Sequence, residues 1–385
     1  MGGAELIGKE EQEAVSEVIG RGVLFRYGFN AKRKNIFVTQ EFENEFCKYM
    51  GCQYALGVSS GSGALRVALA ALGINRGDEV ITQCFTFVAT IESIIEAGAV
   101  PVLTEVDKSL NMDPKDIEAK ITSKTRAIMP VHMLGVPARL DEILAVARKH
   151  NIPVLEDSCQ ACGTGYKGKK TGTLGALGTY SFDYVKTLTT GEGGMVVAND
   201  KRLYDLARYY HDHGHEHNPE LPRGEDSHSV TGFNFRMGEI QGAIGKVQLV
   251  RLNQVLADQR KNKNQIKKAI AGIPGIEFRD LPDPEGDGGD TLAFFLPNAQ
   301  AAKAFNQFLS KEKIDTKILP SAMNWHFAGN WSHMMKLLPP FRADAWPQSE
   351  SLLKRAIALP VSVRMNEEQI QNVINGVKRA AKEVL

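Results

Sequence analysis

The sequence shows almost no excess of charge of either sign: 46 Lys and Arg side chains face 45 Asp and Glu, a formal net charge of +1. Proteins whose main task is to bind nucleic acid usually carry a basic excess, so this balance argues against that class. The sequence also lacks an apolar run of membrane-spanning length, and its first residues have no apolar core typical of a signal peptide. We therefore expect a protein of the cytoplasm.

Cysteine is scarce, with five residues in 385. A small, odd number indicates free thiols in a reducing compartment rather than a disulfide framework. Cys159 and Cys162 have C-x-x-C spacing, but a zinc site needs two further ligands, and Cys47 and Cys52 are five positions apart instead of three. We interpret the C-x-x-C pair as small buried residues.

Two further binding signatures are missing. No G-x-G-x-x-G follows a predicted strand, which argues against a nicotinamide-dependent dehydrogenase. The loop D-P-E-G-D-G-G-D (283–290) resembles a calcium loop only in part, because Phe294 stands where the bidentate Glu should be. The run H-D-H-G-H-E-H (211–217) has four histidines but no framework of further ligands elsewhere, so we expect a polar loop facing the substrate and no metal.

What is present is a regular alternation of apolar runs and helical patterns, with 43% hydrophobic and 24% charged residues overall. Near-continuous apolar strands separated by helices predict a mostly parallel sheet covered on both faces, in an α/β protein. Ligands of such sheets bind beyond the carboxyl ends of the strands. We expect strands at 54–58, 79–85, 100–106, 127–132 and 152–157, with helices at 64–72 and 140–150 between them.

The C-terminal part has its own alternation. A long helix is predicted from near Arg236 to about Ile270, with apolar residues at helical spacing. A strand at 292–296, a helix at 299–311 and a terminal helix from about Glu367 follow. We expect a large domain over residues 1–245 and a smaller α/β domain over residues 246–385.

Three motifs fall at predicted strand ends. The small residues of V-S-S-G-S-G-A-L (58–65) would let backbone N–H groups approach a phosphate at a helix N-terminus, although they also suit an ordinary turn. Asp157 ends the strand at 152–157 and could hold a proton on a heteroaromatic nitrogen or cap a helix. Lys186 follows the strand at 178–182 and could be a solvated charge or the amine that forms a Schiff base with an aldehyde. Together, phosphate cradle, carboxylate and amine predict pyridoxal 5'-phosphate as the cofactor.

The same motifs carry a family resemblance. The chain resembles the DegT/DnrJ/EryC1/StrS sugar aminotransferases along nearly its whole length. The motifs that carry the resemblance are, in order, S-S-G-S-G-A-L, F-T-F-V-A-T (85–90), E-D-S-C-Q, S-F-x-x-x-K, G-E-G-G and G-F-N-F-R-M. The resemblance implies fold type I of the pyridoxal phosphate enzymes, with a mostly parallel seven-stranded sheet in the large domain. It also implies transaminase activity, with glutamate as the usual amino donor.

Site residues carried over from the family follow its motifs. The resemblance implies that Asp157 pairs with the ring nitrogen and that Lys186 binds the cofactor and moves the proton. In one dehydratase branch of the family a His replaces this lysine, so its presence here favours transamination. The other implied cofactor contacts are Gly61, Ser62 and Ser181 at the phosphate, Phe87 stacked on the ring and Gln160 by the ring hydroxyl. Asn234 would reach the phosphate of a neighbouring subunit, which implies a homodimer with shared sites.

The substrate is indicated by departures from the common family pattern. Three segments resemble a branch of the family that aminates a sugar acid for lipopolysaccharide. They are S-F-D-Y-V-K, which contains Asp183 and Tyr184, L-F-R-Y-G-F (24–29) and M-N-W-H-F-A-G-N-W (323–331). That branch converts 8-oxo-3-deoxy-manno-octulosonate to 8-amino-3,8-dideoxy-manno-octulosonate (Kdo8N).

Candidate substrate contacts follow from that resemblance. Arg26 would pair with the substrate carboxylate, or is a solvated surface residue. Tyr27, His213 and His326 are candidates for sugar hydroxyls, and His132 is equally well interpreted as a satisfied core histidine. Two alternatives stay open: an aminotransferase of a nucleotide-linked keto-deoxyhexose or keto-cyclitol, and a catalytically silent regulator that keeps the cofactor fold.

Overall fold

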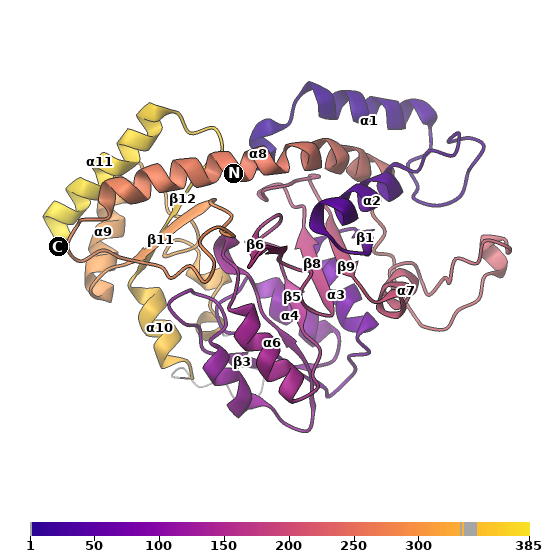
Figure 1. The fold of residues 1–385 in the computed structure, drawn as a ribbon, viewed down its shortest axis with the longest axis horizontal. Coiled ribbons are helices and arrows are strands. Elements are labelled where there is room, and N and C mark those ends of the chain that lie inside the picture. Colours follow the sequence, from indigo (N-terminus) through magenta and orange to yellow (C-terminus); the bar gives the residue numbers. More distant parts are fainter. Residues whose placement is uncertain (1, 332, 335–344) are drawn as a thin grey trace.

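The computed structural model describes residues 2–331, 333–334 and 345–385. A central sheet lies between two layers of helices, and a long helix along one side joins it to a smaller C-terminal part (Figure 1). Within the described residues, seven strands make up this sheet, in the spatial order β1 (Tyr54–Val58), β9 (Gly194–Ala198), β8 (Leu177–Ser181), β5 (Leu155–Asp157), β4 (Thr125–Met129), β2 (Glu79–Gln83) and β3 (Val100–Thr104).

Strand direction is parallel throughout the sheet except at β9, which is antiparallel to both of its neighbours. The two halves of the sheet meet at β4 and β5, where Asp157 N–H donates to the carbonyl of Pro130 at 2.9 Å and His132 N–H donates to the carbonyl of Asp157 at 3.0 Å. The predicted fold class, a mostly parallel seven-stranded α/β sheet, is confirmed.

Four observed strands, β2, β3, β4 and β5, are shorter than the apolar runs 79–85, 100–106, 127–132 and 152–157 that suggested them. Beyond Gln83 the run continues to Phe85, but Phe85 leaves the sheet and forms a bridge with Phe327. Pro130 ends the regular ladder of β4, since proline has no N–H to donate. An apolar run shows that a segment is buried, but only its partners decide how far the ladder extends.

Each face of the sheet packs on its own helices because neighbouring strand residues point to opposite sides. Val80 lies in the cluster with α3 (Gly61–Ala71), α4 (Val88–Glu96) and α7 (Lys201–Tyr210), whereas Ile81 lies in the cluster with α6 (Leu140–Lys149). On that second face, α2 (Val38–Met50) and α8 (Glu239–Ile270) pack on Tyr180 and Phe182.

Helix ends follow local capping rules. The Asp200 side chain accepts the N–H groups of Arg202 and Leu203 at the start of α7, and Asn366 and Gln369 form a capping box at the start of α11 (Glu367–Val384). Gly51, with φ of 73°, ends α2 in the left-handed conformation. Of these three helices only α11 was predicted, and it begins at Glu367 as expected.

The C-terminal part is an antiparallel sheet of β10 (Glu277–Phe278), β11 (Thr291–Phe295) and β12 (Ala356–Pro360), covered by α9 (Ala299–Lys311), α11 and the end of α8. The remaining elements are α1 (Lys9–Arg21), α5 (Pro114–Ile117), α10 (Pro347–Lys354), β6 (Gly165–Tyr166), β7 (Lys169–Lys170) and short 3-10 turns, including Met133–Gly135 and Met323–Trp325. Within the described ranges, no helix is both long and apolar enough to span a membrane.

The division into two domains at residue 245 stays a prediction. Helix α8 passes that position without a break, as the long salmon helix in Figure 1 shows. Leu249 and Leu256 of α8 pack beneath the large sheet, whereas Ile266 and Ile270 belong to the C-terminal core. This packing favours a change of domain between Leu256 and Ile266 rather than at 245.

Candidate active site

Polar and aromatic side chains gather beyond the carboxyl ends of β5 and β8. The N-termini of α3 and α4 meet the same edge, because in parallel units each helix begins where a strand has just ended. The residues at this edge come from five separate parts of the chain, and the contacts below join them.

Asp157 is the buried carboxylate of this edge, 2% exposed at the end of β5. Its carboxylate accepts the hydroxyl of Thr90 at 2.8 Å and the N–H of Cys159 at 3.1 Å. Thr90 in turn lies 2.7 Å from the hydroxyl of Thr86. Since the Thr90 proton points to Asp157, the Thr86 hydroxyl donates to Thr90. A directed chain of two buried hydroxyls therefore orients the carboxylate.

The start of α3 forms a close turn against β8. The Ser60 side chain caps the helix by accepting the N–H of Gly63 at 3.0 Å, and Ser62 is exposed. A Cβ atom on Gly61 would lie 2.7 Å from Cβ of Ser181 and 3.3 Å from the sulfur of Cys159. Only glycine fits there, so backbone N–H groups at a helix N-terminus face the crevice, an arrangement that suits an anionic phosphate.

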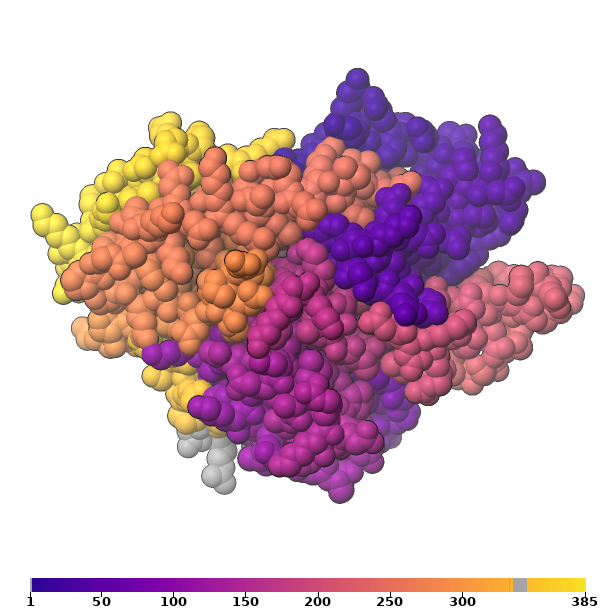
Figure 2. Space-filling model, viewed as in Figure 1, coloured from indigo at the N-terminus to yellow at the C-terminus, as the bar shows by residue number. Residues whose placement is uncertain are grey.

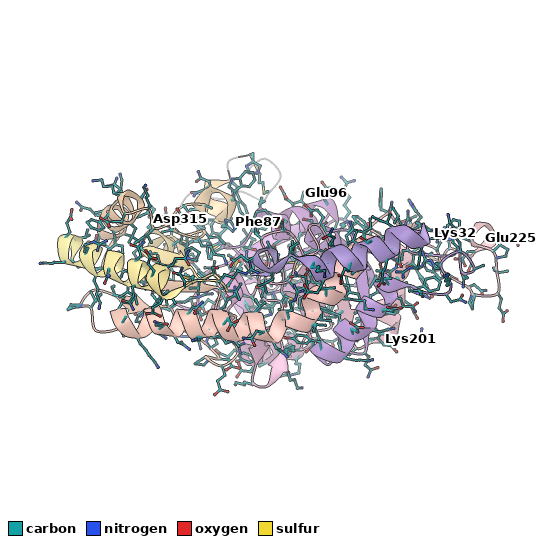
Figure 3. All side chains as sticks on the ribbon, turned by 90° about the horizontal axis from the view of Figure 1, so that it is seen from above. Lys32, Phe87, Glu96, Lys201, Glu225 and Asp315 are labelled. Carbon is teal, nitrogen blue, oxygen red and sulfur yellow. The ribbon has the colours of Figure 1, made fainter. Side chains whose placement is uncertain are left out.

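Phe87 and His326 form an aromatic wall above this turn. Phe87 precedes α4 and is 43% exposed, and its ring centroid lies 5.4 Å from that of His326. In Figure 3 Phe87 lies where the C-terminal part, in yellow and orange, meets the violet N-terminal part. Burial lowers the pKa of His326, and the charge of Lys186 lowers it further, against the Ala322 carbonyl that raises it. The lowered pKa therefore favours the neutral form of His326, which packs against the partly exposed ring of Phe87.

Lys186 is half-buried in the turn that follows β8. Its N–H donates to the carbonyl of Asp183 at 3.0 Å, and its carbonyl accepts the N–H of Gly3 at 3.1 Å. Asp183 also accepts the N–H of Val185 at 2.8 Å, so this carboxylate shapes the turn. The positive charge of Lys186 is close enough to act on the pKa of both Cys159 and His326.

Two predicted cofactor contacts are partly occupied by the protein itself. The Gln160 side-chain oxygen accepts the N–H of Leu134 at 3.0 Å, which fixes the amide at the edge of the crevice. The Ser181 hydroxyl lies 3.4 Å from the N–H of Asp183 and is in contact with the Gly61 turn.

The remaining candidates lie elsewhere. Arg26 is 7% exposed and ion-paired to Glu43 at 2.5 Å, beside β1. Burial alone would lower the pKa of Arg26, but the charges and hydrogen bonds of Glu43 and Tyr27 together outweigh burial and raise it. The interpretation of Arg26 as a solvated surface residue is therefore wrong. A contact with a substrate carboxylate stays a prediction, and the Glu43 pairing favours a role in the fold.

Tyr27, His213 and Asn234 lie around the segment between α7 and α8, which projects from the body (Figures 1 and 2). The Tyr27 hydroxyl lies 2.9 Å from Nε2 of His211, and His213 is exposed with φ of 56°. Asn234 is exposed, and its side-chain oxygen accepts the N–H of Arg236 at 3.2 Å. Their roles toward sugar or a neighbouring subunit stay predictions.

The histidine run 211–217 is held by carboxylates. The buried Asp212 carboxylate accepts hydrogen bonds from the guanidinium groups of Arg223 and Arg236. The Asp226 carboxylate accepts the N–H of His217 at 2.8 Å. Burial lowers the pKa of His217 to about 4. In the part of the chain that the structure describes, no three or more His, Cys, Asp or Glu side chains are grouped as a metal site requires.

His132 lies inside the large domain rather than in the crevice. Its Nδ1 accepts the N–H of Ala138 at 3.0 Å, so its Nε2–H donates to Glu156 at 3.0 Å. Both ring nitrogens have partners, which supports the interpretation of a satisfied core histidine.

Comparison with known protein families covers nearly the whole chain. Residues 5–378 match the DegT/DnrJ/EryC1/StrS aminotransferase family. The chain belongs to this family.

Individual relatives agree. A GDP-perosamine synthase of Escherichia coli O157:H7 is 43% identical over 245 residues, 63% of this chain and 66% of the synthase, just under two thirds of its length. The spore coat polysaccharide biosynthesis protein SpsC of Bacillus subtilis (strain 168) is 33% identical over 98% of this chain and 96% of its own. The solved aminotransferase of Psychrobacter cryohalolentis has a TM-score of 0.87 at 28% identity, covering 98% of both chains.

The aminotransferase family uses pyridoxal phosphate, so the predicted cofactor is confirmed. The residues of the crevice fit it: the Gly61 turn has no room for a side chain and leaves backbone for the phosphate, and Phe87 exposes a ring face. Asp157 would meet the ring nitrogen and Lys186 the aldehyde carbon. When bound, the cofactor supplies an electron sink for the bond that is broken at the amino acid.

Thr90, Thr86 and Cys159 were not among the predicted site residues. A signal was present, because F-T-F-V-A-T places two threonines four positions apart, on one side of a helical turn. Sequence spacing does not reveal that this side faces Asp157, which is 67 positions away from Thr90.

We expect Thr90→Val to weaken amino transfer by roughly tenfold, the scale of one hydrogen bond to a charged group. The substitution keeps the side-chain shape but removes the donor to Asp157 and the acceptor of Thr86. Single-turnover rates with glutamate, measured across pH, would show a lower maximum and a displaced profile. Thr90→Ser is the matched control, since it keeps the hydroxyl and should retain most of the rate. Equal losses in the two variants would contradict a role of the hydroxyl.

Proposed function

We propose that this family member transfers an amino group from an amino acid, with glutamate as donor, to the carbonyl carbon of a sugar. The observation that carries the proposal is the buried Asp157, oriented by Thr90 and Cys159, in the same crevice as Lys186. The Asp157 carboxylate holds a proton on the ring nitrogen. The Lys186 amine moves the proton that leaves the donor amino acid, as a general base and then an acid.

The alternative of a silent regulator makes an opposite prediction. A binding protein has no need of an oriented buried carboxylate beside a lysine, since both cost stability when no charge is being compensated. The test is the first half-reaction: purified protein with pyridoxal phosphate and glutamate should release 2-oxoglutarate in an amount equal to the sites. No release from protein that binds the cofactor would favour the regulator.

Two sugar substrates compete. The sequence resemblance supports 8-oxo-3-deoxy-manno-octulosonate, with Kdo8N as product. The GDP-perosamine synthase relative, whose name includes a nucleoside diphosphate, supports a nucleotide-linked keto-deoxyhexose. Arg26 was the main physical support for a substrate with a carboxylate, and its pairing with Glu43 removes that support. We therefore favour the nucleotide-linked sugar as substrate. With glutamate as donor, a panel of both carbonyl sugars would decide by their relative kcat/KM.

Homodimerisation is part of the proposal. The exposed Asn234 lies at the base of the segment between α7 and α8, where its main chain pairs with Asp212, and its exposed side is accessible to a second copy. Sedimentation would show a dimer. Mixing an Asn234→Ala variant with a Lys186→Ala variant would restore activity only if each site takes Asn234 from the other subunit.

We expect Arg26→Ala to destabilise the fold rather than to affect one substrate selectively. Glu43 would be left buried and unpaired, which typically costs about 3–5 kcal/mol. Its carboxylate also accepts the N–H of Gly57 in β1, so the edge strand should loosen. Thermal and denaturant unfolding would measure the loss. The double variant Arg26→Leu with Glu43→Leu should recover much of it. Unchanged stability with a selective loss of the sugar half-reaction would restore the substrate role.

A further inference from the structure

Two partly exposed thiols lie together where helix α2 ends. The N–H groups of Gly51 and Cys52 both donate to the carbonyl of Cys47, at 2.8 and 3.2 Å, and Gly51 is left-handed with φ of 73°. The bond from Cys52 is the longer-range bond of a Schellman closure, which frequently brings together the side chains of the third residue before the helix end and the second after it. Here both of those residues are cysteines.

The backbone geometry at this turn suits a disulfide. The N–H of Cys52 donates to the carbonyl of Cys47 at 3.2 Å, so a single hydrogen bond joins the two main chains directly. A disulfide requires Cα atoms about 4.4–6.8 Å apart, and residues joined in this way are close neighbours in space.

The two thiols differ in acidity. The neighbouring Cys47 thiol lowers the pKa of Cys52, and the N–H groups of Cys52 and Tyr54 lower it further, against burial, which raises it. The same contact raises the pKa of Cys47. A stabilised thiolate beside a protonated thiol is the pattern of reactive dithiols, because one sulfur attacks and the other resolves.

The other cysteines lack this combination. Cys84 and Cys162 are buried in the core, and burial raises the pKa of both. The pKa of Cys159 is raised as well, first by burial and then by the Asp157 charge. The C-x-x-C pair, which is the more familiar spacing in sequence, is therefore the less reactive one.

We propose that Cys47 and Cys52 form a reversible dithiol–disulfide site that reacts with low-molecular-weight disulfides such as oxidised glutathione. The Cys52 thiolate attacks one sulfur of the reagent, forming a mixed disulfide and releasing one thiolate, which takes up a proton. Cys47 loses its proton and attacks the Cys52 sulfur, which releases the second thiol. Counting the proton that Cys52 gives to solvent when its thiolate forms, the protein loses two electrons and two protons, and the reagent gains both.

The test uses the full-length holoenzyme and oxidised glutathione. After denaturation, the free thiols should fall from five to three, with a Cys47–Cys52 linkage in the peptide map and full recovery on reduction. Cys47→Ser should stop at a glutathione adduct on Cys52. Cys52→Ser should react at least about tenfold more slowly, since it lacks the acidic thiol. Cys162→Ala is the matched control and should behave as the native chain.

Three results would overturn the proposal: five free thiols after prolonged exposure to oxidised glutathione, a linkage between Cys159 and Cys162, or equal reaction rates of Cys47→Ser and Cys52→Ser. Thermal unfolding of each variant, compared with the native chain, shows that the protein tested is folded. The outcome is independent of the sugar substrate and of amino transfer.

Discussion

Replacing Lys186 by alanine should lower the rate of the glutamate half-reaction by at least roughly a thousandfold, the range typical of a lost general acid–base group. The physical reason is that the charge of the Lys186 amine reaches both Cys159 and His326 in the crevice. Lys186 is also half-exposed, and its backbone rather than its side chain holds the turn through Asp183 and Gly3. The variant should therefore fold and still bind cofactor.

A second measurement identifies the lysine chemically. Borohydride reduction of protein saturated with pyridoxal phosphate, followed by peptide mapping, should leave the cofactor covalently on Lys186. Lys201→Ala is the control, because Lys201 is an exposed lysine of α7 that pairs with Asp205. A reduced adduct on another lysine, or none at all, would remove Lys186 from its role.

Asp157→Asn should retain cofactor but lose at least about a hundredfold in the same half-reaction. The amide has nearly the shape of the carboxylate and can still accept the Thr90 hydroxyl, yet it carries no charge to hold a proton on the ring nitrogen. It can also accept only one of the two protein hydrogen bonds, so the N–H of Cys159 loses its partner.

The matched control for this variant is Asp200→Asn. Asp200 caps α7, and asparagine is an equally good capping residue, so this substitution should leave rate and stability close to native. Near-normal rates for Asp157→Asn would mean that Asp157 only supports the strand end. An Asp157→Asn protein that no longer binds cofactor would instead show that its charge serves binding more than proton retention.

The outline of the fold was largely predictable because its signals are local. Apolar runs predicted six strands of the large sheet, and β1 matched the prediction from Tyr54 to Val58. Helix α9 likewise extends from Ala299 to Lys311, as its pattern and the Asn298 cap indicate. The strand end at Gln83 was missed, since the continuing apolar run packs on Phe327 of the C-terminal part.

By itself, the sequence determined the order of the predicted strands and helices along the chain and the glycine turn at 61. It also determined that Asp157 ends a strand and that Lys186 follows one. Periodicity, caps and motif spacing act over a few residues, so they can be recognised without a structure. The tertiary structure alone decided that Thr90 orients Asp157, that Phe87 faces His326, and that Arg26 pairs with Glu43 rather than facing solvent. Those contacts join residues far apart in the chain, and they exist only because the sheet topology brings distant strand ends to one edge.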